Sequence, residues 1–258
     1  MTIAETQERW IRLIIKFSTV ILALFIFGTS EAGAKEISVG MGNYEPYYIA
    51  KGDTGIFPDI LKAVFRYMPD HQPKFLFGRP NKRLWKDFEN GKIDAVANVF
   101  DSAKLEGCKS DPVFRFRDIA ISKTDRNLEL HGLSDLKGLR VVAFQGAKKF
   151  MGPAFKAFDG FAEYSEIADQ KLQSGMLYRG RADVSIGDMF LFLQSLGKIK
   201  AQAKEFAFHD IFPVLTTRMG FRDRDMCSVF NMALRKVKSS GEYEAIFTSY
   251  LNKFGYQK

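Results

Sequence analysis

The first half of the chain alternates short apolar runs with amphipathic segments. Residues 36–41, 73–78 and 92–99 are apolar runs of strand length. Residues 57–68 carry apolar side chains at intervals of three and four, which predicts a helix with one buried face, and residues 81–91 predict a shorter helix. The resulting β-α-β-α-β order is typical of a mostly parallel sheet covered by helices. The apolar positions of the first helix are Phe57, Ile60, Leu61, Val64, Phe65 and Met68.

A second block of the same order follows, so residues 120–210 predict a second α/β unit. Its expected strands cover 118–123, 139–144, 161–167 and 182–188, and its expected helices cover 148–158, 169–180 and 189–197. An extended run over 212–221 and two helices complete the chain, the last helix with a core-type apolar face. Together the two blocks predict an α/β protein whose mixed, mostly parallel sheets carry helices on both faces.

The N-terminus has the organisation of a secretory signal. Basic residues precede an apolar run, FSTVILALFIFG, and Ala32 and Ala34 form an A-x-A cleavage site. We therefore predict a signal peptide over residues 1–34, a mature start at Lys35 and a periplasmic location. The alternative is an uncleaved anchor over residues 10–28, but Arg12 and Lys16 interrupt that window.

The charge pattern argues against nucleic-acid binding. The formal net charge is +8, and it stays +8 without residues 1–34, which hold equal numbers of basic and acidic side chains. The basic residues are dispersed among acidic ones and form no Lys/Arg block. A positive surface of this kind can steer anionic ligands.

Two cysteines and three histidines limit the disulfides and metal sites that the chain could form. In an oxidising compartment Cys108 and Cys227 suggest one disulfide, and two separate buried thiols are the alternative. His71, His131 and His209 are far apart without metal-ligand spacing, so we expect no metal site. The sequence has no G-x-S-x-G elbow and no phosphate loop, and SVGMGN lacks the third glycine of a dinucleotide fingerprint. These absences favour recognition without a cofactor over catalysis.

A series of short motifs resembles the type II periplasmic solute-binding proteins, specifically the polar amino-acid-binding group that serves ABC importers (bacterial extracellular solute-binding protein family 3). The motifs occur in the family's order and span nearly all of the mature chain. They are YEPY at 44–47, GIFPDI at 55–60, FENGKIDA at 88–95, SDP at 110–112, the segment 136–146 that begins with LKG and ends at Gly146, GRADVSIGD at 180–188 and GEYEAI at 241–246.

This resemblance implies a two-lobe clamp. Lobe 1 would combine residues 35–115 with 217–258, and residues 116–216 would form lobe 2 with its two hinge strands, near 116–119 and 213–217. A ligand would lie between the lobes, and closure would be a hinge motion. Cys108 and Cys227 would then share lobe 1.

The resemblance also implies where ligand groups lie. The family's carboxylate-binding arginine corresponds to Lys104, a point charge without the planar fork of arginine, so Lys104 either holds an anion or is solvated. Asp188 corresponds to the acidic residue that meets a ligand ammonium, and its alternative role is the N-cap of the helix that follows.

Four further positions are expected at the ligand. Tyr44 would supply an aromatic wall, and Asn81 stands where the family often has a second aromatic. Arg83 and Lys148 are candidate anion-binding residues, Lys148 because it follows the Gly146 turn at a helix N-terminus. For both, a solvated side chain is the alternative.

These observations predict a monomeric periplasmic binding protein that delivers a small polar ligand, amino-acid-like or carboxylate-bearing, to the permease of an ABC importer. A membrane sensor is an alternative partner. An enzyme of the cyclohexadienyl dehydratase type, using Asp101 and Asp188, is a second alternative. A protein that kept the fold but lost small-molecule binding is a third.

Overall fold

The computed structural model describes residues 33–42, 44–78 and 81–257 of the chain. Residues Lys35–Lys258 form one compact unit, whose boundary coincides with the mature start expected from the sequence. Residues 1–32 of the predicted signal peptide lie outside the described residues. Among the described residues, none of the helices has the length and apolar character needed to cross a bilayer.

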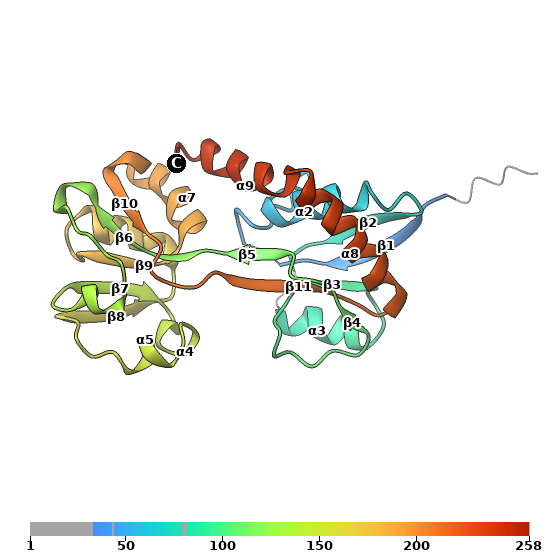
Figure 1. Cartoon of the computed structure of the whole chain (residues 1–258), viewed down its shortest axis with the longest axis horizontal. Coiled ribbons are helices and arrows are strands. Elements are labelled where there is room, and N and C mark those ends of the chain that lie inside the picture. Colours follow the sequence, from blue (N-terminus) through green and yellow to red (C-terminus); the bar gives the residue numbers. More distant parts are fainter. Residues whose placement is uncertain (1–32, 43, 79–80, 258) are drawn as a thin grey trace, which may run out of the picture. The chain divides into compact units, whose positions relative to one another are not determined.

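The first of two sheets combines strands from both ends of the unit (Figure 1). Its order is β2-β1-β3-β11-β4, and β5 pairs with β11. β1 is parallel to β2 and β3, whereas β11 is antiparallel to β3, so a strand from the C-terminal half completes an N-terminal sheet. The strands are β1 (Lys35–Gly40), β2 (His71–Leu76), β3 (Ala95–Val99), β4 (Cys108–Lys109), β5 (Phe114–Phe116) and β11 (Leu215–Phe221).

The second sheet has the order β10-β6-β9-β7-β8. β7 runs parallel to β8 and β9, while β6 runs antiparallel to β9 and β10. The sheet therefore contains a parallel core of β9, β7 and β8. On one side of this core lie β6 and β10, which are antiparallel to each other. Its strands are β6 (Asp118–Lys123), β7 (Arg140–Phe144), β8 (Glu163–Ile167), β9 (Val184–Asp188) and β10 (Phe206–His209).

Helices cover the sheets and supply most of the core. Every apolar position predicted for the first helical segment is buried, although the helix itself ends at Phe65, three residues before Met68. The helices are α2 (Ile56–Phe65), α3 (Asn81–Glu89), α4 (Ala147–Phe150), α5 (Pro153–Ala157), α6 (Gln173–Tyr178), α7 (Met189–Ile199), α8 (Arg224–Ser239) and α9 (Glu242–Lys253), with 3-10 turns at Thr124–Arg126, Leu133–Leu136, Gln170–Leu172 and Ala203–Glu205.

The expected helix over residues 148–158 is wrong, because the chain forms two short helices there. Gly152, with a φ of 92°, stands between α4 and α5, and Pro153 begins α5. A proline has no N–H for the hydrogen bond that would continue α4, but it fits the first helical position. The 169–180 segment likewise divides into a 3-10 turn and the shorter helix α6.

Two chain segments connect the sheets. Arg117 alone separates β5 from β6, and residues 210–214 separate β10 from β11. β5 and β11 are hydrogen-bonded antiparallel, with Phe116 opposite Leu215, and they run side by side between the sheets (Figure 1). The connections therefore form a paired ribbon.

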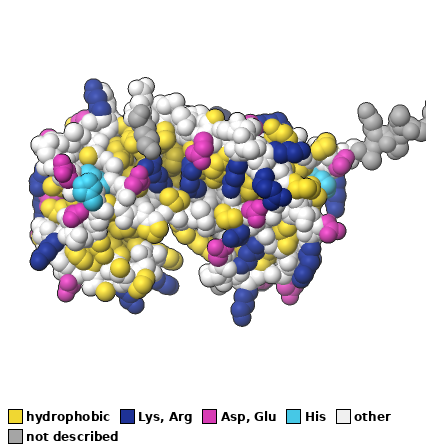
Figure 2. Space-filling view, viewed as in Figure 1, with side chains coloured by type: hydrophobic (Ala, Val, Ile, Leu, Met, Phe, Trp, Pro, Cys, Tyr) yellow, Lys and Arg dark blue, Asp and Glu magenta, His cyan; other side chains and the backbone are white. Residues whose placement is uncertain are grey.

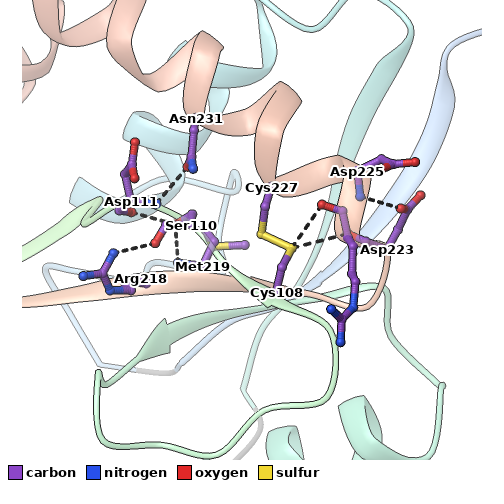
Figure 3. Close-up of a disulfide and its surroundings, with 10 residues drawn as sticks. Cys108, Ser110, Asp111, Arg218, Met219, Asp223, Asp225, Cys227 and Asn231 are labelled. Atoms are coloured by element: carbon purple, nitrogen blue, oxygen red, sulfur yellow. Dashed lines mark hydrogen bonds between the residues drawn. A yellow bond between two sulfur atoms is a disulfide. The ribbon is translucent and has the colours of Figure 1, made fainter.

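The structure joins Cys108 and Cys227 in a disulfide that closes a sequence separation of 119 residues. Figure 3 shows the bond between β4 and the start of α8. Next to it, Asn231 of α8 accepts a hydrogen bond from the Asp111 backbone at 2.8 Å, and Ser110 exchanges hydrogen bonds with Met219 of β11. Both cysteines contribute to the structure around the first sheet.

Replacing both cysteines by serine should lower the free energy of unfolding by about 3–5 kcal/mol, because the unfolded chain regains the freedom of a long loop. Urea unfolding of the mature protein measures the effect. A thiol reductant should lower the free energy of unfolding of the wild type toward that of the double variant. It should leave the stability of the double variant unchanged. Equal stability of the wild type and the double variant in the absence of reductant contradicts this account.

Candidate functional site

A cavity of about 440 Å³ lies between the two sheets. This volume suits a small organic ligand. Elements of both sheets contribute to its wall, and many of the contributing residues lie at or just beyond strand ends. The lining residues are Tyr44, Tyr47, Asn98, Phe100, Phe116, Asp118, Phe144, Ala168, Asp169, Gln170, Lys171, Asp188, Leu191 and Leu215.

Asp188 ends β9, and its buried carboxylate caps α7. One oxygen accepts hydrogen bonds from the backbone N–H groups of Phe190 and Leu191, both at 3.0 Å. The other accepts from the Tyr47 hydroxyl at 2.5 Å. Burial raises the pKa of Asp188 to about 6, although these donors act in the opposite direction. Both the capping role and the cavity position considered from the sequence are therefore present.

Asp118 is the second carboxylate in the cavity, and it begins β6 directly opposite Asp188 in the β6–β9 register. Burial, followed by the charge of Asp188, raises its pKa to about 7. Among the described residues, no donor or cationic side chain contacts the Asp118 carboxylate. Antiparallel pairing thus places two acidic groups side by side.

Aromatic rings surround the two carboxylates. Tyr44 and Tyr47 meet edge to face with ring centroids 5.8 Å apart, and Tyr47 lies 5.0 Å from Phe116. Burial, followed by the negative charge of Asp188, raises the pKa of both tyrosines, so they stay neutral phenols. Phe100 and Phe144 complete the apolar wall.

Asn98 adds a polar group near the end of β3, and its backbone has a φ of 65°, a conformation unfavourable for most residues. Its side-chain oxygen accepts a hydrogen bond from the Thr217 hydroxyl at 2.9 Å. Sequence reasoning missed Asn98. The signal available was a polar residue inside the otherwise apolar strand AVANV.

Comparison with known proteins identifies the fold. No family model and no curated protein matches the chain. Solved structures do match it over nearly their full length. An ancestral cationic amino acid solute-binding protein is 19% identical with a TM-score of 0.66, over 85% of this chain and 96% of that one. The GluR0 ligand-binding core in complex with L-glutamate is 14% identical with a TM-score of 0.62, over 84% and 99%.

An ABC uptake transporter substrate-binding protein from Streptococcus pneumoniae with bound histidine is 16% identical with a TM-score of 0.53, over 86% of this chain and 95% of that one. The chain has the two-lobe fold of type II solute-binding proteins. The fold class expected from the sequence motifs is thereby confirmed.

The structure brings two of the expected site residues, Tyr44 and Asp188, to the cavity. Lys104 lies elsewhere. Its side chain is exposed and lines a separate cavity of about 500 Å³. The other residues of that cavity include Trp85 of α3 and two glutamates, Glu89 and Glu106. The loop that carries Lys104 therefore does not deliver a cation to the space between the sheets.

Arg83 and Asn81 both belong to α3. The Arg83 guanidinium forms an i,i+4 ion pair with Asp87 at 3.2 Å, and its side chain is 64% exposed. Arg83 does not line the cavity between the sheets. The Asn81 side chain lies outside the described part of the structure.

The Lys148 side chain turns toward α5 instead of the cavity. Its ammonium donates to the backbone carbonyls of Phe155 at 3.1 Å and of Phe158, at the end of that helix. The anion near the Gly146 turn is the chain's own Glu166, which accepts from the N–H groups of Gly146 and Lys148 at 2.7 and 2.9 Å. The lysine thus stabilises local structure in the second half.

Asp101, considered as a catalytic acid, is exposed and forms an ion pair with Arg218. The hydrogen bond from Arg218 lowers the pKa of Asp101. The carboxylate that accompanies Asp188 is instead Asp118, which sequence reasoning missed. Its signal was an acidic residue just before the apolar run of β6. Within the described residues, no group of three His, Cys, Asp or Glu could hold a metal ion.

Asp118→Asn should make stability at neutral pH higher and less dependent on pH. The pKa of Asp118 is about 7 in the folded chain and about 3.9 when unfolded. The folded state therefore holds more protons between about pH 4 and 7, and this group makes the free energy of unfolding fall as pH rises through that window. We expect a gain of up to about 4 kcal/mol at pH 8 and almost none at pH 4.

Urea unfolding at pH 4, 6 and 8 measures the effect. Asp159→Asn is the matched control, because Asp159 is exposed and outside the cavity. The same pH dependence in wild type and Asp118→Asn would show that Asp118 titrates normally.

Proposed function

We propose that the chain is an extracytoplasmic solute-binding protein that holds a small polar ligand between its two sheets and delivers it to an ABC importer. The observation that carries this proposal is the cavity of about 440 Å³, which combines aromatic rings with the buried carboxylates of Asp118 and Asp188. Proteins of the same fold, described as solute-binding or substrate-binding proteins, support it.

Ligand capture would act through the two lobes expected from the sequence, residues 35–115 with 217–258 and residues 116–216. The β5–β11 ribbon connects them, so rotation about this ribbon can open the cavity. Tyr47 contacts Asp188 across the cavity wall. A ligand that contacts both sides favours the closed arrangement in proportion to its preference for that state.

The partner would be the membrane permease of the importer, reached after export through the predicted signal peptide. On the face shown in Figure 2, Lys and Arg are interspersed with Asp and Glu, a distribution unlike a nucleic-acid site. A membrane sensor is the other partner considered.

A ligand screen on the mature protein tests the proposal. Amino acids, organic anions and amines are added singly, and a compound that binds the folded state raises Tm by mass action. Tyr44→Ala should weaken binding of that compound roughly tenfold, because a ring of the cavity wall is lost. Lys104→Ala should leave affinity unchanged, since Lys104 lines a different cavity. No rise in Tm with any compound contradicts the proposal.

A periplasmic enzyme of the cyclohexadienyl dehydratase type is the second candidate. One observation favours it: burial raises the pKa values of Asp118 and Asp188 to about 7 and 6, a range suited to general acid–base catalysis. Under the binding proposal, prephenate incubated with the protein should be recovered unchanged by chromatography. Turnover that Asp118→Asn abolishes, and that Asp159→Asn preserves, would favour the enzyme.

A further inference from the structure

The charges around the cavity between the sheets are mainly negative. Its lining includes three acidic residues, Asp118, Asp169 and Asp188, and among the described lining residues Lys171 is the only basic one. Asp118 and Asp188 lie opposite each other in paired strands, and Asp188 is only 5% exposed. Two carboxylates in such a setting repel each other unless a proton or another cation is shared between them.

Nearby arginines are already engaged with other acidic groups. Arg117, which precedes Asp118, forms an ion pair with Asp210. Arg115 holds Glu244 with two hydrogen bonds of 2.9 Å. Neither arginine lines the cavity. A carboxylate-bearing ligand would therefore meet no guanidinium from the connecting β5–β6 segment.

Backbone N–H groups at three helix starts also have acceptors from the chain itself. Asp188 accepts from Phe190 and Leu191 at the start of α7. Asp169 accepts from the Lys171 N–H at 3.0 Å at the start of the 3-10 turn. Glu166 accepts hydrogen bonds from backbone N–H groups at the turn before α4. Amides that can bind a ligand anion at such positions are thus occupied by side-chain carboxylates.

From this arrangement we infer that the cavity binds a small organic ammonium ion that needs no carboxylate, with the ammonium held by Asp118 and Asp188 against the rings of Tyr44 and Tyr47. This inference rests on the proposed binding function and names its ligand class. Asp118 has the acceptor capacity for the ammonium, since its carboxylate has no donor among the described residues.

The aromatic wall suits the same ligand class. An ammonium over the face of a tyrosine or phenylalanine is attracted by the ring quadrupole, and the attraction grows as water is excluded. Phe100, Phe116 and Phe144 add apolar surface for a hydrocarbon body. A ligand anion placed in the same space would be close to three carboxylates and to neutral phenols, with Lys171 as the single basic side chain among the described lining residues.

Matched ligand sets test the inference by isothermal titration calorimetry on the mature protein. One set is phenethylamine, phenylalanine and 3-phenylpropionate; a second is cadaverine, lysine and 6-aminohexanoate; a third is agmatine and arginine. In at least one set we expect the amine without a carboxylate to bind at least as tightly as its amino acid. Asp118→Asn and Asp188→Asn should each weaken that amine at least tenfold. Asp159→Asn, the exposed control, should leave the affinity unchanged.

Asparagine also caps helices, so Asp188→Asn should preserve the start of α7, and far-ultraviolet circular dichroism checks that both variants fold. Should Asp188→Asn unfold, Asp118→Asn decides the question. Amino acids that bind more tightly than their decarboxylated partners in every responding set overturn the inference but leave the solute-binding proposal standing. Tight binding of 3-phenylpropionate and of no other probe also overturns the inference and leaves the solute-binding proposal standing. No heat of binding with any probe, together with no hit in the thermal screen, overturns both.

Discussion

The Asp188 carboxylate is the group on which the site depends. A buried carboxylate is costly unless donors satisfy it. Asp188 receives these donors from two directions, from the start of α7 and from Tyr47 in the loop after β1. One side chain therefore fixes a helix of the second sheet and an aromatic ring of the first. The position of the cavity follows from this contact, because Tyr47 and Asp188 both line it.

Asp118 adds a second acidic group where folding alone would favour a neutral one. Burial raises the pKa values of both carboxyl groups above their usual range, and the charge of the facing Asp188 raises the pKa of Asp118 further. Such an arrangement lowers stability at neutral pH and is typical of functional sites. The aromatic core around Phe57 and the disulfide between Cys108 and Cys227 stabilise the first sheet beside it. The proposed recognition of a polar ligand thus rests on this pair of carboxylates beside the aromatic rings of the cavity.

Much of the fold could be predicted because local periodicity and tertiary burial agree. The 3-4 spacing from Phe57 to Val64 identified the buried face of α2, and the apolar run of β9 identified a central strand. Prediction failed where one or two residues interrupt a pattern, as Gly152 and Pro153 do between α4 and α5. The two-residue strand β4 and three-residue strand β5 are too short for any period to be visible.

The sequence by itself determined the two α/β blocks, the aromatic Tyr44 and the acidic end of β9, since each depends on local order along the chain. Only the tertiary structure decided which charges meet. It placed Lys104 at a separate cavity, turned Lys148 toward α5 and brought Asp118 beside Asp188. The physical reason is that strand register and helix packing bring together residues 70 positions apart, and a linear motif does not encode that pairing.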